Sequence, residues 1–236
     1  MFEAEAAGLR DLSATRSIRT PAPLCSGRVG EQEYLVTVYL ELGHPSGKSQ
    51  AIAGSQLALL HGNTESRFGW QLDNHIGATP QSNMWQDDWV DFWREQRLGY
   101  QLDLAMRNGY GGRLQMLGQR LLEQCPSLID HAPVPSLIHG DLWGGNMGFD
   151  ANGQPVIYDP ATYYGDREAE IAMTELFGGF SGDFYAAYRE AWPLDPGYAT
   201  RKTLYNLYHI LNHLNLFGGG YLAQAQGMME RLLAEV

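Results

Sequence analysis

Three polar side chains occur in a fixed order around one predicted hairpin. Asp141 and Asn146 lie five positions apart, and Asp159 ends a short apolar strand over residues 155–159. Glycines at 144 and 145 allow a tight backbone turn between the first two side chains. A strand that ends in a carboxylate is rigid where that carboxylate is presented. The order therefore predicts a fold in which all three side chains face one pocket.

Phosphoryl transfer from ATP uses this set of groups. One carboxylate accepts the proton of the attacking hydroxyl, while an amide oxygen and a second carboxylate hold Mg²⁺ on the phosphates. Asp141 is thus the candidate base, and Asn146 and Asp159 are the candidate metal ligands. The alternative is structural, because Asp and Asn are common in turns and caps. The second carboxylate, on a strand and in kinase order, favours the catalytic interpretation.

The composition narrows the class of protein. The chain has 236 residues, enough for one domain or two small lobes, with 44% hydrophobic and 18% charged residues. Its net charge of −11 and its lack of a basic cluster argue against a nucleic-acid partner. Cys25 and Cys125 are far apart and have no metal-type spacing, so we expect free thiols in a reducing compartment.

No membrane or export segment is expected. No apolar run approaches the ~20 residues that a membrane span needs. The first residues lack the basic and apolar regions of a signal peptide. We therefore expect a cytoplasmic protein with no membrane partner, and the sequence leaves its oligomeric state open.

Hydrophobic spacing predicts few strands and many helices. A helix is expected over the first dozen residues, a buried strand over 34–40, and a helix over 49–61. Residues 62–83 indicate a long irregular connection. From residue 167 the pattern is helical to the end, with three interruptions. This distribution is typical of a two-lobed kinase, with the connection between lobes just after residue 40.

Aromatic residues between positions 85 and 100 recur at helical spacing. We interpret this stripe as core packing, although a ligand platform would use the same residue types. A further helix is expected around 114–122.

Many segments of the chain resemble the fructosamine kinase (ketosamine-3-kinase) family, which is related to aminoglycoside phosphotransferases and choline kinases. The resemblance covers nearly the whole chain, and the context of Trp143 and the stretch 164–168 separate this family from other small-molecule kinases. The matching segments, in family order, are 68–70, 73–74, 79–81, 88–93, 95–98, 137–146, 159–161, 164–168, 172–173 and 216–219.

The resemblance implies an α+β, protein-kinase-like fold with a mostly helical C-terminal lobe and a truncated small N-terminal β lobe. Residues 1–41 would be the remnant of the N-terminal lobe, and residues 42–236 the helical lobe with the catalytic loop and the metal-binding strand. The implied reaction is ATP-dependent phosphorylation of the 3-hydroxyl of a ketosamine, a fructosamine or ribulosamine on a small amine or a protein lysine. The labile product sheds its sugar, which repairs glycation.

The resemblance also assigns roles around the catalytic loop. ATP and Mg²⁺ are the implied cofactors, and the backbone of Tyr39, Leu40 and Glu41 would meet the adenine edge. His139 would hold the catalytic loop. Trp143 would stack on the sugar or, alternatively, pack beneath the loop.

The chain departs from the family pattern at its start. Family members begin with a glycine-rich loop and a strand lysine that grips the ATP phosphates, and this sequence starts after both. Glu5 matches the helix acid that pairs with that lysine, but only Lys48 and Lys202 occur in the chain. Either Met1 is an internal methionine taken as the start, or the chain is truncated. The DNA upstream of the first codon distinguishes the two.

Two other functions remain open at this stage. A chain without the lysine and loop could be a non-catalytic remnant that serves as a binding module, because positioning of the phosphates supplies most of this catalysis. Alternatively, the same Asp-Asn-Asp set could act on an aminoglycoside, choline or homoserine. The sequence does not identify the amine or the sugar.

Overall fold

The computed structural model describes residues 1–236, which form two compact units. Unit 1 contains Met1–Ser66 and Val134–Leu194, and unit 2 contains Arg67–Pro133 and Asp195–Val236. Small antiparallel sheets and many helices make the fold α+β, as the sequence predicted. The expected boundary between lobes after residue 41 stays a prediction. The boundaries between the two compact units fall at other points of the chain, after residues 66, 133 and 194.

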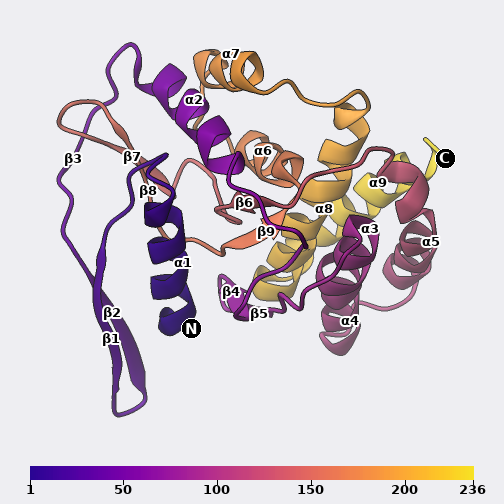
Figure 1. The fold of residues 1–236 in the computed structure, drawn as a ribbon. Coiled ribbons are helices and arrows are strands. Elements are labelled where there is room, and N and C mark those ends of the chain that lie inside the picture. The colour runs from indigo at the N-terminus through magenta and orange to yellow at the C-terminus, as the bar shows by residue number, and fades with distance from the viewer. The chain divides into compact units, whose positions relative to one another are not determined.

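Unit 1 holds the predicted site residues and most of the strands (Figure 1). The helix predicted over 49–61 is confirmed as α2, and helical structure resumes at residue 167 with α6. The elements of this unit are α1 (Phe2–Ala14), β1 (Pro23–Val29), β2 (Gln32–Thr37), β3 (Leu42–Gly43), α2 (Ser49–His61), β6 (Ser136–Ile138), β7 (Met147–Asp150), β8 (Pro155–Ile157), β9 (Tyr163–Gly165), α6 (Arg167–Leu176) and α7 (Gly182–Ala191).

Two small sheets flank the predicted site residues Asp141, Asn146 and Asp159. β7 and β8 form an antiparallel hairpin, with Met147 opposite Ile157 and Phe149 opposite Pro155, and β3 pairs with the other edge of β7. β6 pairs antiparallel with β9. The three residues of β6 and of β8 are all buried, so the core fixes the two points from which the site residues extend.

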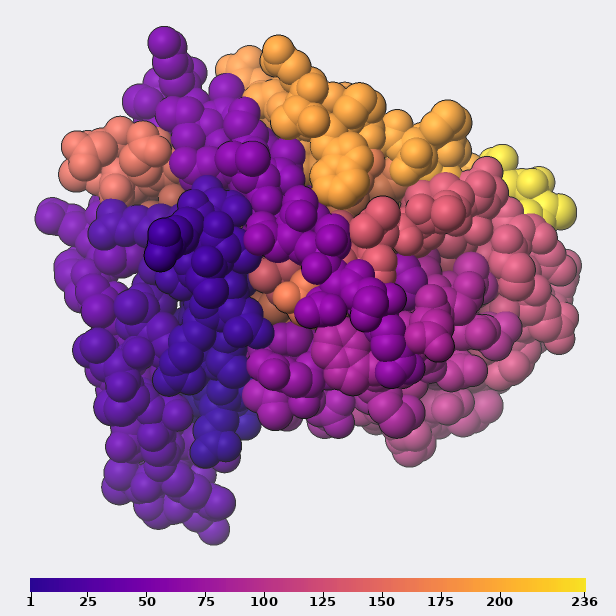
Figure 2. Space-filling view, in the orientation of Figure 1, coloured from indigo at the N-terminus to yellow at the C-terminus, as the bar shows by residue number.

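The strand predicted over 34–40 differs from the expectation. β2 ends at Thr37 and pairs only with β1, and its residues are exposed or half-buried. Tyr34 and Val36 are each about 40% exposed. α1 lies beside this hairpin in both views (Figures 1 and 2). A two-stranded ribbon beside one helix cannot bury both of its faces, so the apolar, β-branched composition predicted the strand but not its burial.

α2 and α7 lie against each other at close range (Figure 1). Gly54 on α2 faces the backbone of α7, and a Cβ atom added there would lie 2.1 Å from the carbonyl oxygen of Phe184. Only a glycine permits this distance, so the contact fixes how the two helices of unit 1 pack.

Unit 2 is built mainly from helices around an aromatic core. Trp89, Phe92 and Trp93 are buried, and Trp89 donates from its indole to the hydroxyl of Tyr205. The predicted aromatic stripe is therefore core packing. The irregular connection contains the short hairpin of β4 and β5. The elements are β4 (Asn74–Ile76), β5 (Thr79–Gln81), α3 (Trp89–Phe92), the π-helical turn η1 (Trp93–Gly99), α4 (Tyr100–Arg107), α5 (Arg113–Leu128), α8 (Tyr198–Phe217), the 3₁₀ turn η2 (Gly219–Tyr221) and α9 (Leu222–Leu233).

The helices of both units fall short of a membrane span. None of them combines the length and the apolar character needed to cross a bilayer.

The close approach of α2 and α7 predicts the effect of one methyl group. Gly54→Ala should lower the free energy of unfolding by about 1–3 kcal/mol, because the helices must separate to admit the Cβ atom. Chemical denaturation monitored by circular dichroism measures the change. Gly47→Ala is the control, since no atom lies within 4 Å of its added Cβ. Equal unfolding midpoints for the two variants would contradict the packing argument.

Candidate active site

Asp141 follows strand β6 after a turn that requires glycine. Gly140 has φ +84°, and a Cβ atom there would lie 2.1 Å from the carbonyl oxygen of Ala161. Side chains other than glycine are strained at this φ and blocked by that oxygen. The sequence had assigned the tight turn to Gly144 and Gly145, neither of which has a positive φ. The turn that places Asp141 is one residue before it.

His139 connects the loop of Asp141 to the strand that leads to Asp159. Its Nε2 lies 2.9 Å from the carbonyl oxygen of Tyr158, and its Nδ1 accepts from the backbone N–H of Asp141 at 3.3 Å. A carbonyl can only accept, so the ring proton is on Nε2. Burial lowers the pKa of His139, which favours this neutral form. The expectation that His139 holds the loop is confirmed.

The side chain of Asn146 is oriented by its own amide hydrogens. Nδ2 donates to the carbonyl oxygen of Asp141 at 2.9 Å, to its Oδ2 at 3.2 Å, and to the carbonyl oxygen of Asp159 at 3.4 Å. These contacts direct the amide nitrogen toward both aspartates and leave Oδ1 without a partner in the chain. The structure therefore brings the three predicted residues together around one amide group.

Asp159 adopts a backbone conformation that is uncommon for residues other than glycine, with φ +59°. It directly follows Tyr158, whose N–H donates to the carbonyl oxygen of Asn146 at 3.1 Å. The residue is exposed and makes no ion pair. Strain of this kind is maintained where the surrounding structure over-determines it, often at functional sites. The prediction that oxygens of Asn146 and Asp159 lie within about 5 Å of each other remains a prediction.

Negative charge accumulates at this point. Burial, then the carboxylate of Asp159, raises the pKa of Asp141 from 3.8 to about 8; the Asn146 hydrogen bond opposes this shift and Glu170 adds to it. Burial and Asp159 also raise the pKa of Glu5, on α1, from 4.5 to about 7. The like charges of these carboxylates repel one another, and the N-terminal ammonium partly opposes the shift at Glu5.

The donor set fits a hard divalent cation. An unpartnered amide oxygen on Asn146 and an exposed carboxylate on Asp159 are the ligand types that Mg²⁺ prefers. A cation between them would also remove the repulsion that raises the pKa of Asp141.

An apolar cavity of about 290 Å³ lies next to these residues in the chain. Tyr39 and Leu40 line it from the segment after β2, and Val156 and Tyr158 line it from β8 and the residue before Asp159. Glu41, which the sequence grouped with Tyr39 and Leu40, is not among the lining residues. The amides of Tyr39 and Leu40 make no backbone hydrogen bond, so they are available to a ligand.

Trp143 has features of both of its expected roles. Its ring lies against Gly145, where a Cβ atom would come within 2.3 Å of it, so part of the side chain packs on the loop. It is still 40% exposed, as is Phe177, whose ring lies edge-on at a centroid distance of 6.3 Å. Part of the tryptophan therefore remains open to solvent, two residues after Asp141 in the chain.

Sequence reasoning missed the buried partner of this loop. Glu170 on α6 is completely buried and accepts from the N–H of Gly140 at 2.8 Å. The available signal was a carboxylate directly before the apolar run Ile171, Ala172 and Met173. Its partner could not be inferred, because the contact spans 30 positions.

Comparison with known proteins identifies the family of this chain. The fructosamine kinase family model matches residues 1–235. The chain belongs to the fructosamine kinase family. It is 52% identical to a Synechocystis protein assigned as a ketoamine kinase, over 99% of this chain and 79% of that protein. It is 43% identical to a chloroplastic protein-ribulosamine 3-kinase of Arabidopsis thaliana, over 99% of this chain and 72% of that protein.

Solved structures agree with this fructosamine kinase fold. A crystal structure assigned as a fructosamine-3-kinase from Haemophilus somnus matches with a TM-score of 0.90 at 31% identity, covering 99% of this chain and 79% of that chain. One from Thermobifida fusca gives 0.87 at 31% identity, with 99% and 80% covered. A choline/ethanolamine kinase family protein from Mesorhizobium loti gives 0.58 at 15% identity over 98% and 77%, which shows the shared fold alone. The predicted kinase-like fold is confirmed.

The raised pKa of Asp141 predicts how stability depends on pH in metal-free protein. Below pH 3.8 the carboxyl is protonated in both folded and unfolded chains and costs nothing. Between pH 3.8 and about 8 the folded chain binds the extra proton, so stability falls as pH rises. Asp141→Asn removes this carboxylate and keeps its size. The variant should therefore melt several degrees above the wild type at pH 9, and the difference should shrink toward pH 4.

Thermal melting of both proteins in chelator-treated buffer at the two pH values makes this measurement. Asp87→Asn, at an exposed position, controls for a general effect of net charge. A variant that is less stable than wild type at pH 9 would show that ionised Asp141 is not destabilised in the fold.

Proposed function

We propose that this protein is an ATP-dependent kinase that phosphorylates the 3-hydroxyl of ketosamines, with Mg²⁺ as the metal. The observation that carries the proposal is the Asn146 amide, whose hydrogens bind Asp141 and the backbone carbonyl of Asp159 and whose oxygen has no partner in the chain. Supporting this, the relatives at 43–52% identity carry the names ketoamine kinase and protein-ribulosamine 3-kinase.

Asp141 is proposed as the base. Its carboxylate would accept a hydrogen bond from the sugar hydroxyl and take that proton as the hydroxyl oxygen bonds to the γ-phosphorus. The bond from phosphorus to the bridging oxygen then breaks, and ADP keeps the electron pair. The Asn146 hydrogen bond to Oδ2 orients the carboxylate for this contact. The base must be ionised to act, so the repulsion from Asp159 has to be neutralised in the working enzyme.

Asn146 and Asp159 would hold the metal, which when bound neutralises phosphate charge and lowers the pKa of Asp141. The cavity lined by Tyr39, Leu40 and Val156 would receive the adenine ring, since it is apolar and borders free backbone amides. Glu41 is retained in the proposed adenine segment through its backbone. The exposed part of Trp143 would stack on the sugar.

A substrate panel tests the activity directly. The protein expressed from its full reading frame is incubated with ATP, Mg²⁺ and, in turn, a fructosamine, a ribulosamine, an aminoglycoside, choline and homoserine. We expect phosphate transfer to the ketosamines, and a loss of about 10³-fold or more in kcat for Asp141→Ala. The matched control is Asp87→Ala, an exposed aspartate that should keep wild-type rates.

Three results would contradict the proposal in different ways. A preference for an aminoglycoside, choline or homoserine keeps the chemistry and changes the substrate. Ketosamine binding without phosphate transfer indicates a non-catalytic binding module. An active Asp141→Ala variant removes Asp141 from the base role.

Metal dependence tests the two proposed ligands. Asp159→Asn and Asn146→Ala should each raise the Mg²⁺ concentration for half-maximal rate by about tenfold or more, because each removes or weakens one oxygen ligand. Titration of initial rate against Mg²⁺ at saturating substrate gives the value. Asn152→Ala, in the exposed turn of the same β7–β8 hairpin, should leave it unchanged. Unaltered Mg²⁺ dependence in both ligand variants would move the metal elsewhere.

A further inference from the structure

The catalytic loop is attached to the interior of unit 1 through one buried carboxylate. Gly140, the residue before Asp141, donates its N–H to Oε2 of Glu170 at 2.8 Å, and Oε1 lies 2.8 Å from Nε2 of His61. Neither side chain of the Glu170–His61 pair is exposed to solvent. Burial alone would raise the pKa of Glu170, but the contacts with His61 and the Gly140 amide hold it below its ordinary value. The carboxylate is thus ionised and needs both donors.

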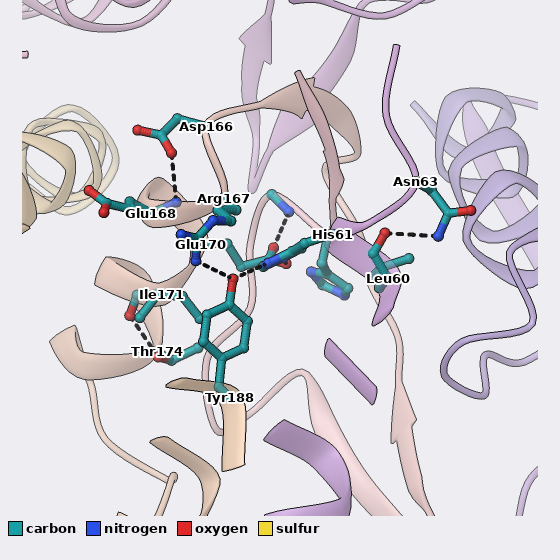
Figure 3. Close-up of polar contacts among 12 residues, drawn as sticks. Leu60, His61, Asn63, Asp166, Arg167, Glu168, Glu170, Ile171, Thr174 and Tyr188 are labelled. Atoms are coloured by element: carbon teal, nitrogen blue, oxygen red, sulfur yellow. Dashed lines mark hydrogen bonds and ion pairs between the residues drawn. The ribbon is translucent and has the colours of Figure 1, made fainter. Parts of the chain in front are cut away.

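The hydrogen bonds continue from His61 to two more side chains. Nδ1 of His61 lies 2.7 Å from the hydroxyl of Tyr188, and that hydroxyl accepts from Nη1 of Arg167 at 3.2 Å. Figure 3 shows the Tyr188 hydroxyl joined by dashed lines to Arg167 on one side and to His61 on the other. The four side chains come from α2, α6 and α7. They form a continuous buried chain that ends at the backbone of the catalytic loop.

The protons of this chain have one arrangement that satisfies every group. Glu170 can only accept, so Nε2 of His61 carries a proton and donates to it. Arg167 can only donate, so the Tyr188 oxygen accepts from it and gives its own proton to Nδ1 of His61. The imidazole is then fixed with Nε2 as the donor to Glu170 and Nδ1 as the acceptor from Tyr188. The hydroxyl of Tyr188 therefore ensures that Nε2 of His61, the ring nitrogen that faces Glu170, carries a proton.

The far end of the chain is anchored firmly. Arg167 also donates to the carbonyl oxygens of Trp192 and Pro193, and its guanidinium lies 4.2 Å from the Trp192 ring centroid. A buried polar chain of this kind gives little net stability over apolar packing, and its best-attested use is to specify one arrangement. Here the arrangement that it specifies includes the amide next to Asp141.

We propose that Glu170, His61 and Tyr188 are positioning residues, which hold the Gly140 amide and thereby place the Asp141 carboxylate for phosphoryl transfer. This role rests on the proposed function, because it assigns Asp141 the base role. None of the three touches substrate. Loss of the Tyr188 hydroxyl frees the imidazole to change tautomer, which releases Glu170 and then the loop. A displacement of about 1 Å at a reacting group can cost on the order of 10²-fold in rate.

Steady-state kinetics separates positioning from folding. Tyr188→Phe should lower kcat by about tenfold and Glu170→Gln by about 10²-fold, with KM for ATP and ketosamine within about twofold of wild type. Rates are normalised to the nucleotide-binding fraction of each preparation, so loss of folded protein does not count. Tyr185→Phe is the matched control, because it removes a hydroxyl from the same helix but from a residue outside the buried hydrogen-bond chain. It should keep the wild-type kcat.

Amide hydrogen exchange at Gly140, followed by NMR on the complete protein, reads the same contact without any substrate. Exchange should accelerate at least tenfold in Tyr188→Phe relative to Tyr185→Phe. Normal exchange together with an unchanged kcat in Tyr188→Phe and Glu170→Gln would overturn the positioning role. If wild-type protein phosphorylates no ketosamine, the proposed function fails. The exchange comparison still decides whether the hydrogen bonds from Tyr188 through His61 and Glu170 hold the loop.

Discussion

Burial and, after it, the nearby carboxylate of Asp159 raise the pKa of Asp141, and the same two causes raise the pKa of Glu5. Like charges brought together in a partly buried position destabilise a fold, so other interactions must hold them there. Around this point the structure supplies that restraint repeatedly. It is present in the left-handed Gly140, in the strained Asp159 and in the Asn146 amide that bonds to both aspartates.

The restraint is built from hydrogen-bonded groups, and the one charged group that contacts the loop, Glu170, is itself paired although it adds to the field at Asp141. His139 is a neutral tautomer that joins Asp141 to Tyr158, and Glu170 is balanced through His61 and Tyr188 by Arg167. The local excess of negative charge therefore stays at the surface-facing side chains, where a cation and phosphates would neutralise it. The interior groups are thus paired by hydrogen bonds, while the negative charge at the open face is not compensated. This difference is the physical basis of the proposed kinase site.

The exposed β1–β2 hairpin shows the limit of composition as a guide. A run of β-branched and apolar residues predicts strand geometry because such side chains suit a pleated backbone. It does not predict what covers the strand, and here the ribbon pairs with no other strand. The aromatic stripe of α3 and η1 shows the opposite case. Its helical spacing predicted a buried face, and the residues of that face did pack together.

The sequence by itself determined the family and the helices with strong periodicity, and it singled out Asp141, Asn146 and Asp159 as candidates, because these depend on local order and short spacing. Only the tertiary structure decided what fixes them. The contact of Glu170 with Gly140 spans 30 positions and that of His61 with Tyr188 spans 127, so no local pattern encodes either pair. The turn that needs glycine was likewise decided by a distant atom, the carbonyl oxygen of Ala161. Long-range packing selects such partners, and one sequence without its fold does not contain that selection.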